Sequence, residues 1–238
     1  MLICLDIETT GYEPKDKICS VGILCFEDNI FVNSLYELVD EDKKIPSLAS
    51  SIHNITNEMI AGKNSFVNSE CYRFLIKHNA QDNSLLVHNA SFVLMLLEAS
   101  GLKWHGKIID TQRVVKHHIP ECELFSLSFL RYELKLYKRE ESLKRECGIK
   151  DALISHHALS DTLIIKLLFD YLQEEISIEK MYELTFANVL LEKFSFGKYL
   201  GRYIEEIAMN DRSYLLWMLS LDDLDDDLRY SLEYYLEG

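Results

Sequence analysis

The sequence predicts an α/β protein with a mixed sheet flanked by helices, followed by a small, mainly helical module. Short apolar runs of strand-like composition alternate with helical patterns in the first part of the chain. The opening runs are joined by a tight turn, which makes neighbouring strands antiparallel. Beyond residue 176 the patterns are almost entirely helical. We therefore expect two domains, residues 1–175 and 176–238, with the boundary in the region 174–190.

Five stretches have the apolar composition of strands, and the turn Glu27-Asp28-Asn29 makes a hairpin of the second and third. The expected strands are residues 2–6, 17–26, 30–39, 84–87 and 107–109. Helical spacing of apolar residues appears between and after them. The expected helices are residues 66–78, 91–100 (stopped by Gly101), one starting at Asp110-Thr111, 126–136 and 157–173, with a looser, short helix in 47–62.

Composition limits the class of protein. The chain has 238 residues, 48% of them apolar, and its six cysteines include no C-x-x-C pair. This spacing of the cysteines is typical of reduced core cysteines in a cytosolic protein and not of a disulfide or zinc framework. No apolar run reaches the length of a membrane span, and strand structure starts at residue 2 without a signal peptide. We expect a cytoplasmic protein that does not enter membranes.

The net charge of −14 argues against a protein that coats nucleic acid generally. The charge is uneven, because acidic residues crowd 222–227 while 103–150 leans basic. The basic stretch has two interpretations, a solvated helix face or a rim that faces phosphates.

Two acidic residues follow the first strand. Asp6 and Glu8 are two residues apart, so they point to the same face of an extended backbone. Adjacent carboxylates repel unless a cation lies between them, and a hard cation such as Mg²⁺ or Mn²⁺ prefers oxygen ligands. The pair alone is a weak signal, since two acids at an exposed strand end would look the same.

Three stretches with candidate functional residues follow one another along the chain: Asp6-Ile-Glu8-Thr-Thr-Gly11, His88-Asn-Ala-Ser-Phe92-Val93 and His156-His-Ala158-Leu-Ser-Asp161. They resemble the motifs of the DEDDh 3′→5′ exonucleases of the ribonuclease-H-like superfamily over residues 1–175. The resemblance implies a two-ion Mg²⁺ or Mn²⁺ site with Asp6, Glu8 and Asp161 as metal ligands and catalytic residues. It also implies that His156 is the catalytic general base.

The adjacent histidines leave the base open to question. Spacing favours His157, which shares a helix face with Asp161 at i,i+4. The family pattern favours His156, in the loop before the helix, and we adopt His156. The resemblance further implies that Thr9, Asn89 and Phe92 bind the substrate, with Phe92 contacting a terminal base or sugar. Helix packing would explain Phe92 equally well.

The chain departs from the family at Val93, where the pattern has an Asp that faces the second ion. Three hypotheses follow. The second ion is held more weakly and activity is reduced; another acid, Glu98 or Asp110, substitutes; or the site is inactive.

The C-terminal segment carries Phe196-Gly-Lys198-Tyr199-Leu-Gly201 and then Asp211-Arg-Ser-Tyr214-Leu-Leu-Trp217. This resembles the C-terminal module of the exodeoxyribonuclease X family. Lys198 and Tyr199 would then bind substrate, whereas Tyr214 and Trp217 also fit a small helical core. We expect a DNA exonuclease that acts on a single-stranded 3′ end and releases 5′ mononucleotides. The alternatives are an inactive nucleic-acid-binding or complex-organising protein and an RNA-directed enzyme.

Overall fold

The computed structural model describes residues 1–150 and 153–237, and in these residues the strands form one five-stranded sheet. Its strand order is β3-β2-β1-β4-β5. The strands are β1 (Leu2–Thr9), β2 (Ile18–Glu27), β3 (Ile30–Leu38), β4 (Ser84–Val87) and β5 (Lys107–Asp110). The β1–β2 and β2–β3 pairs are antiparallel, whereas β1–β4 and β4–β5 are parallel. The predicted mixed sheet is confirmed, with every expected strand present.

Strand β1 lies at the centre of the sheet and sends alternate side chains to opposite faces. Ile3 and Leu5 enter one buried cluster, and Cys4 enters the cluster on the other face. Asp6 and Glu8 follow Cys4 in the two-residue period, so they emerge on the same face as Cys4, at the carboxyl end of the strand. The register of one strand thus decides where both carboxylates point.

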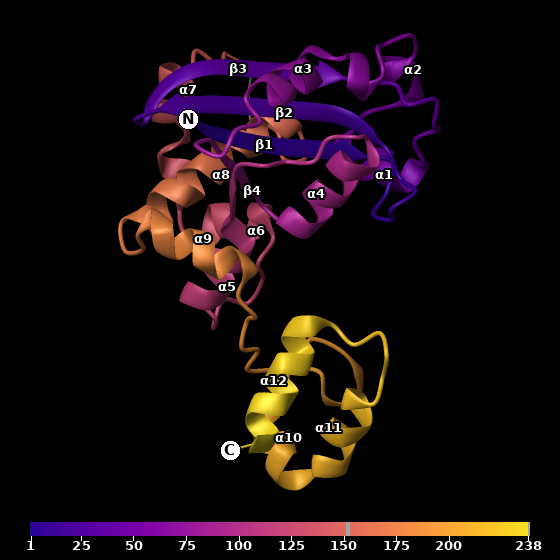
Figure 1. Ribbon diagram of the computed structural model, residues 1–238, viewed down its shortest axis with the longest axis vertical. Helices are drawn as coiled ribbons and strands as arrows, with labels where there is room; N and C mark the ends of the chain where they lie inside the picture. The colour runs from indigo at the N-terminus through magenta and orange to yellow at the C-terminus, as the bar shows by residue number, and fades with distance from the viewer. Residues whose placement is uncertain (151–152, 238) are drawn as a thin grey trace.

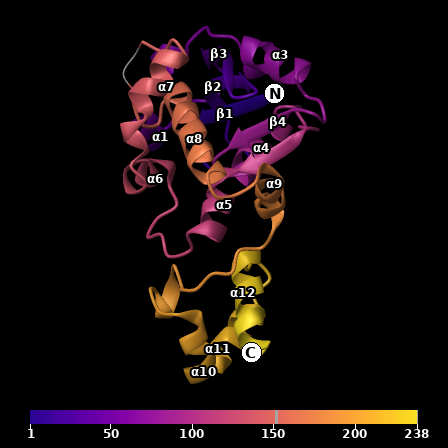
Figure 2. The same ribbon diagram turned by 90° about the vertical axis from the view of Figure 1, so that its left-hand side faces the viewer.

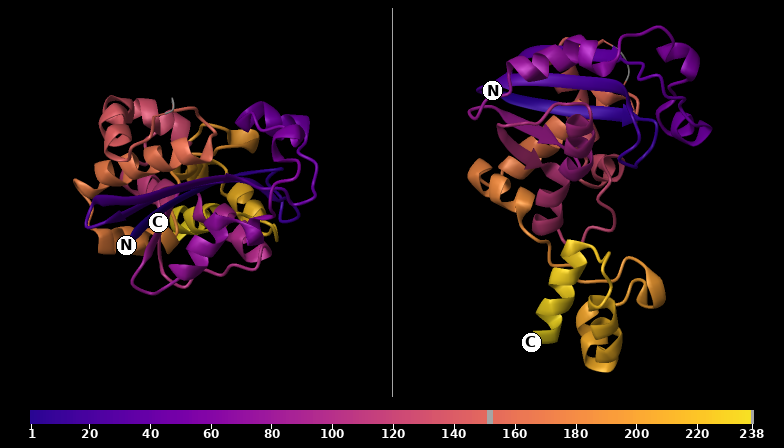
Figure 3. Two further views of the ribbon diagram at one scale, coloured as in Figure 1. Left: turned by 90° about the horizontal axis from the view of Figure 1, so that it is seen from above. Right: turned by 45° about the vertical axis from the view of Figure 1, so that its right-hand side comes forward.

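Helices cover both faces of the sheet, which runs between two helical layers when viewed from above (Figure 3, left). One layer holds α3 (Glu70–Lys77) and α4 (Ala90–Ala99). The other holds α5 (Thr111–His118), α6 (Leu127–Glu133), α7 (Glu140–Glu146), α8 (Ala158–Gln173) and α9 (Ile178–Phe186). The connections contain α1 (Ser47–His53), α2 (Asn57–Ile60) and the short 3₁₀ turns η1 (Phe66–Asn68) and η2 (Leu136–Lys138).

The last helices form a lobe of their own, seen in yellow below the sheet (Figures 1 and 2). They are α10 (Ile204–Asn210), α11 (Arg212–Leu219) and α12 (Asp226–Glu237), preceded by the turn η3 (Gly197–Tyr199). A third buried cluster, which includes Ile204, Leu215 and Leu232, holds this lobe together.

The expectation that the chain is almost entirely helical from Ser177 onward is wrong for residues 187–203. Apart from η3, this segment consists of turns and irregular structure, and an isolated antiparallel bridge joins Lys193 to Tyr203. Gly197 and Gly201 both have positive φ, at 74° and 79°, which a helix does not allow. In residues 1–150 and 153–237, no helix is both long enough and apolar enough to cross a membrane.

Candidate active site

A cavity of about 240 Å³ opens at the carboxyl end of β1, beside the first turns of α4 and α8. Seven of the predicted site residues line it: Asp6, Glu8, Thr9, Asn89, Phe92, His156 and Asp161. They come from three motifs that are far apart in the chain. The structure therefore brings these motifs together around one cavity.

Gly22 explains how Asp161 reaches the β1 carboxylates. It pairs with Asp6 in the β1–β2 register, and a Cβ at Gly22 would lie 2.3 Å from the carbonyl carbon of Ala158. Only glycine therefore lets the first turn of α8 rest directly on the sheet. This role was not predicted from the sequence, although a lone glycine within an apolar strand was a usable signal.

Asp6, Glu8 and Asp161 all have raised pKa values. Burial, then the neighbouring carboxylates Asp161 and Glu8, raise the pKa of Asp6 well above its usual range. Burial and Asp161 raise the pKa of Glu8 to about 8. Burial also raises the pKa of Asp161 to about 7, against the lowering effects of the His156 N–H and the Arg131 charge. A bound cation would offset the repulsion among these three carboxylates and stabilise their ionised forms.

A divalent metal fits this donor set. Glu8, His156 and Asp161 each offer one ligand atom, and these atoms lie within 4.8 Å of one another. Carboxylate oxygens suit hard cations such as Mg²⁺ and Mn²⁺. Asp6 borders the same cavity and shares the charge of the group.

The two histidines have different surroundings. His156 lines the cavity and is exposed to solvent. Its backbone has a positive φ of 59°, and its backbone N–H donates to Asp161 Oδ2 at 2.9 Å. His157 stacks on Tyr36 at 4.3 Å between ring centroids and caps α8 by accepting from Ser160 N. Of the two, His156 is the one that borders the carboxylates.

The other predicted substrate residues are held by local hydrogen bonds. Asn89 has a left-handed backbone, and its side chain accepts from Phe92 N to cap α4. The Thr9 hydroxyl donates to Gly11 O at 2.7 Å. His53 also lines the cavity: Ile55 N donates to its Nδ1, which leaves the proton on Nε2 to bond Thr9 O at 3.2 Å.

Val93 borders the cavity but is only 2% exposed and belongs to a hydrophobic cluster. The two acids considered as substitutes do not line the cavity. Asp110 is buried and accepts backbone N–H bonds from Asn89, Ala90 and Gln112, so its oxygens are already used. Glu98 is exposed on α4. The geometry thus gives no support to replacement of the missing acid by either residue.

Lys198 and Tyr199 lie in the C-terminal lobe and do not line the cavity. Both contact Asp211: Lys198 Nζ lies 3.0 Å and Tyr199 Oη 2.6 Å from Asp211 Oδ2. These hydrogen bonds hold the pKa of Asp211 well below its usual range. The positive charge of Lys198 is therefore partly balanced within the lobe.

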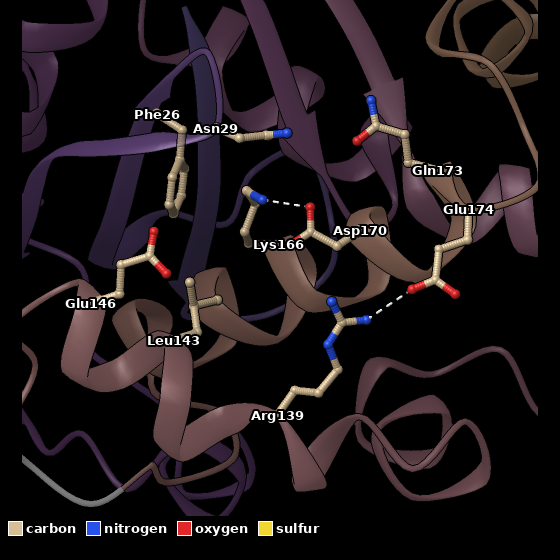
Figure 4. Close-up of a pocket in the computed structure, with 9 residues that line it drawn as sticks. All are labelled: Phe26, Asn29, Arg139, Leu143, Glu146, Lys166, Asp170, Gln173 and Glu174. Carbon is tan, nitrogen blue, oxygen red and sulfur yellow. Dashed lines mark hydrogen bonds and ion pairs between the residues drawn. The ribbon is translucent and has the colours of Figure 1, made fainter.

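A larger cavity of about 640 Å³ lies between the β2–β3 turn and the helices α7 and α8 (Figure 4). Its cations are paired, Lys166 with Asp170 at 2.5 Å and Arg139 with Glu174 at 3.1 Å. Two of its three carboxylates are thus paired with cations, so this cavity lacks the uncompensated carboxylate cluster found at the first one.

Comparison with known proteins identifies the group to which these motifs belong. A family model described as "Exonuclease" matches residues 3–169, and a model described as "Exodeoxyribonuclease X-like C-terminal" matches residues 194–220. The chain belongs to the exonuclease family. The three motifs around the cavity and the mixed five-stranded sheet agree with this membership.

Relatives cover all or part of this exonuclease-family chain. Exodeoxyribonuclease 10 of Escherichia coli is 30% identical, with both chains covered completely. DNA polymerase III PolC-type of Thermotoga petrophila is 29% identical over 76% of this chain and 13% of its own. Among solved structures, exonuclease X in complex with 5′-overhanging duplex DNA matches with a TM-score of 0.61 and 25% identity, covering 78% of this chain and 99% of that one.

Proposed function

We propose that the protein is a metal-dependent 3′→5′ exonuclease that hydrolyses DNA and releases 5′ mononucleotides. One observation carries the proposal: Asp6, Glu8, Asp161 and His156, from distant parts of the chain, border one cavity together with substrate-side residues. The carboxylates are crowded enough to need cations, as their raised pKa values indicate. Hydrolysis of a phosphodiester needs both charge stabilisation and an activated water.

Each residue has a role in this proposal. Asp6, Glu8 and Asp161 would hold Mg²⁺ or Mn²⁺, which supply Lewis acidity and lower the pKa of water when bound. The exposed imidazole of His156 accepts a proton from the attacking water through a ring nitrogen. The imidazole must be in its neutral form to accept this proton.

The nucleic-acid end would occupy the rest of the cavity. Thr9 and Asn89 offer polar atoms to the 3′ end, and the Phe92 ring offers a flat surface to a base or sugar. The DNA-acting relatives favour DNA over RNA. We keep Lys198, whose side chain is 60% exposed, and Tyr199 as residues that guide the strand, although their bonds to Asp211 weaken that role.

A ladder assay tests the proposal. A 5′-labelled single-stranded DNA is incubated with the protein in Mg²⁺ or Mn²⁺, beside the Asp6→Ala and Val93→Asp variants and an RNA strand of equal sequence. We expect a 3′-end ladder on DNA that Asp6→Ala abolishes. An undegraded strand with every variant would refute the proposed activity.

Val93 favours a second candidate, an inactive exonuclease fold that binds nucleic acid or organises a complex. A buried valine cannot bind an ion or its water where the family pattern has an Asp. In the same assay, this candidate predicts that only the Val93→Asp variant degrades the DNA strand to a ladder. It also predicts DNA affinity that Asp6→Ala leaves unchanged and Lys198→Ala lowers.

A further inference from the structure

Two tyrosines and two lysines form an exposed surface beside the candidate active site. Tyr132 lies in the last turn of α6 and is 61% exposed, and Tyr137 in η2 is 42% exposed. Their ring centroids lie 5.7 Å apart with an interplanar angle of 37°. Lys135 lies between the two tyrosines in the sequence, Lys138 follows Tyr137, and both lysines are exposed. We call these four residues the α6–η2 surface.

The two lysines differ from the cations around them. Arg131 pairs with Glu140 at 2.5 Å, Arg139 with Glu174 and Lys144 with Glu141. Within residues 1–150 and 153–237, neither Lys135 nor Lys138 lies within ion-pair distance of a carboxylate. Their charge is available to a ligand, on a chain whose net charge is −14. Exposed tyrosines with unpaired lysines are the elements of a surface that binds single-stranded nucleic acid.

The α6–η2 surface continues from the cavity. Ser126, Leu127 and Ser128, at the start of α6, line the same cavity as Asp6. Ser128 and Tyr132 are four residues apart on the helix and so share a face. One turn of helix separates them, about 6 Å along the axis. A strand whose 3′ end enters the cavity can therefore run along α6 to the tyrosines.

We propose that the α6–η2 surface binds the single-stranded part of the substrate a few nucleotides before the 3′ end. A base stacks on the exposed tyrosine rings, and Lys135 and Lys138 contact the phosphates. This inference rests on the proposed function and extends it, because it names the protein surface that holds the strand outside the cavity. The paired charges in the larger cavity of Figure 4 offer no equivalent surface.

The test measures binding rather than turnover. A twelve-nucleotide DNA strand and a dinucleotide, both fluorescently labelled, are titrated with the full chain in Ca²⁺, and gels confirm that the DNA stays intact. We expect Tyr132→Ala with Tyr137→Ala to weaken binding of the longer strand about tenfold or more, since a base that stacks on an aromatic ring adds to the affinity. Dinucleotide affinity should stay unchanged. Each of Lys135→Ala and Lys138→Ala should reduce the slope of log K against log salt by about 0.7.

Lys63→Ala and Tyr234→Ala are matched controls, since both residues are exposed and lie on other parts of the chain. They should leave both affinities unchanged. If the surface variants bind the longer strand as tightly as the original chain, this inference is wrong and the proposed function stands. If the original chain binds neither strand, both fail.

Discussion

Val93 is the residue at which the chain departs from the family pattern. It is buried in a hydrophobic cluster at the edge of the cavity, where an Asp would face the proposed metal site. We predict that Val93→Asp increases metal-dependent hydrolysis at least tenfold. Without metal, the buried charge should lower the free energy of unfolding by about 2–4 kcal/mol. Ladder assays and thermal melts with and without Mn²⁺ measure the two effects.

Val93→Asn provides the matched control for the charge. It has the shape of Asp without an ionisable group, so it should lower stability but not restore hydrolysis. Equal activity in the Asp and Asn variants would show that the missing acid does not limit the reaction.

The carboxylate cluster makes a prediction about pH. The pKa values of Glu8 and Asp161 are raised in the folded protein to about 8 and about 7, above reference values of about 4. The folded state therefore holds more protons than the unfolded state between these values, and stability falls as pH rises. We predict that the melting temperature without metal is roughly 5 °C lower at pH 8 than at pH 5, and that Mn²⁺ reverses most of this loss.

Asp161→Asn tests whether the carboxylates cause the effect. Removing one charge from the crowded group should stabilise the metal-free protein at pH 8 and reduce the stabilisation that Mn²⁺ provides. If the variant melts with the same pH dependence as the original chain, the effect has another source.

At the scale of elements, the contact between β2 and α8 determines the site. A Cβ at Gly22 would lie 2.3–2.5 Å from backbone atoms of Ala158 and Leu159, so Gly22→Ala must displace the first turn of α8. Overpacking of this kind costs about 1–3 kcal/mol. Because Asp161 lies on that turn, we predict at least tenfold weaker Mn²⁺ binding, measured by calorimetry, together with a lower melting temperature.

Gly62→Ala separates site geometry from general stability. Gly62 has a φ of 73°, and a Cβ added there would have no neighbour within 4 Å, so alanine costs about 1 kcal/mol through the backbone alone. Its Mn²⁺ affinity should remain unchanged. Loss of affinity in both variants would mean that stability, not the α8 contact, controls the metal site.

At the scale of the whole molecule, an ion pair between Arg113 and Asp227 connects the C-terminal lobe to the sheet domain. Arg113 on α5 donates to both oxygens of Asp227 on α12, at 2.9 and 2.8 Å, and also to Ala187 O. Burial would raise the pKa of Asp227, but hydrogen bonds from Arg113 and Val189 N lower it overall. We propose that the domain boundary follows α9, which packs with the sheet domain through Met181.

We predict that Arg113→Ala or Asp227→Ala frees the lobe and increases trypsin cleavage at Lys193 about tenfold, equivalent to about 1.4 kcal/mol. Both changes together should have no greater effect than either alone, because they remove the same interaction. Lys180→Ala breaks an exposed pair with Glu183 and should change little. An additive effect of the Arg113 and Asp227 variants would show that they act separately.

Local sequence predicts all five strands and most of the helices before residue 187, and it indicates the candidate residues of the site. The apolar run at residues 2–5 predicts β1, apolar spacing predicts α8, and three motifs indicate Asp6, Glu8, His156 and Asp161, because these signals depend on neighbours in the chain. The remaining features depend on tertiary packing. The close contact at Gly22, the stacking of His157 on Tyr36, the use of Asp110 by backbone N–H groups and the Arg113–Asp227 pair all join distant segments. Such contacts arise only when the packed chain brings those segments together, so no local pattern predicts them.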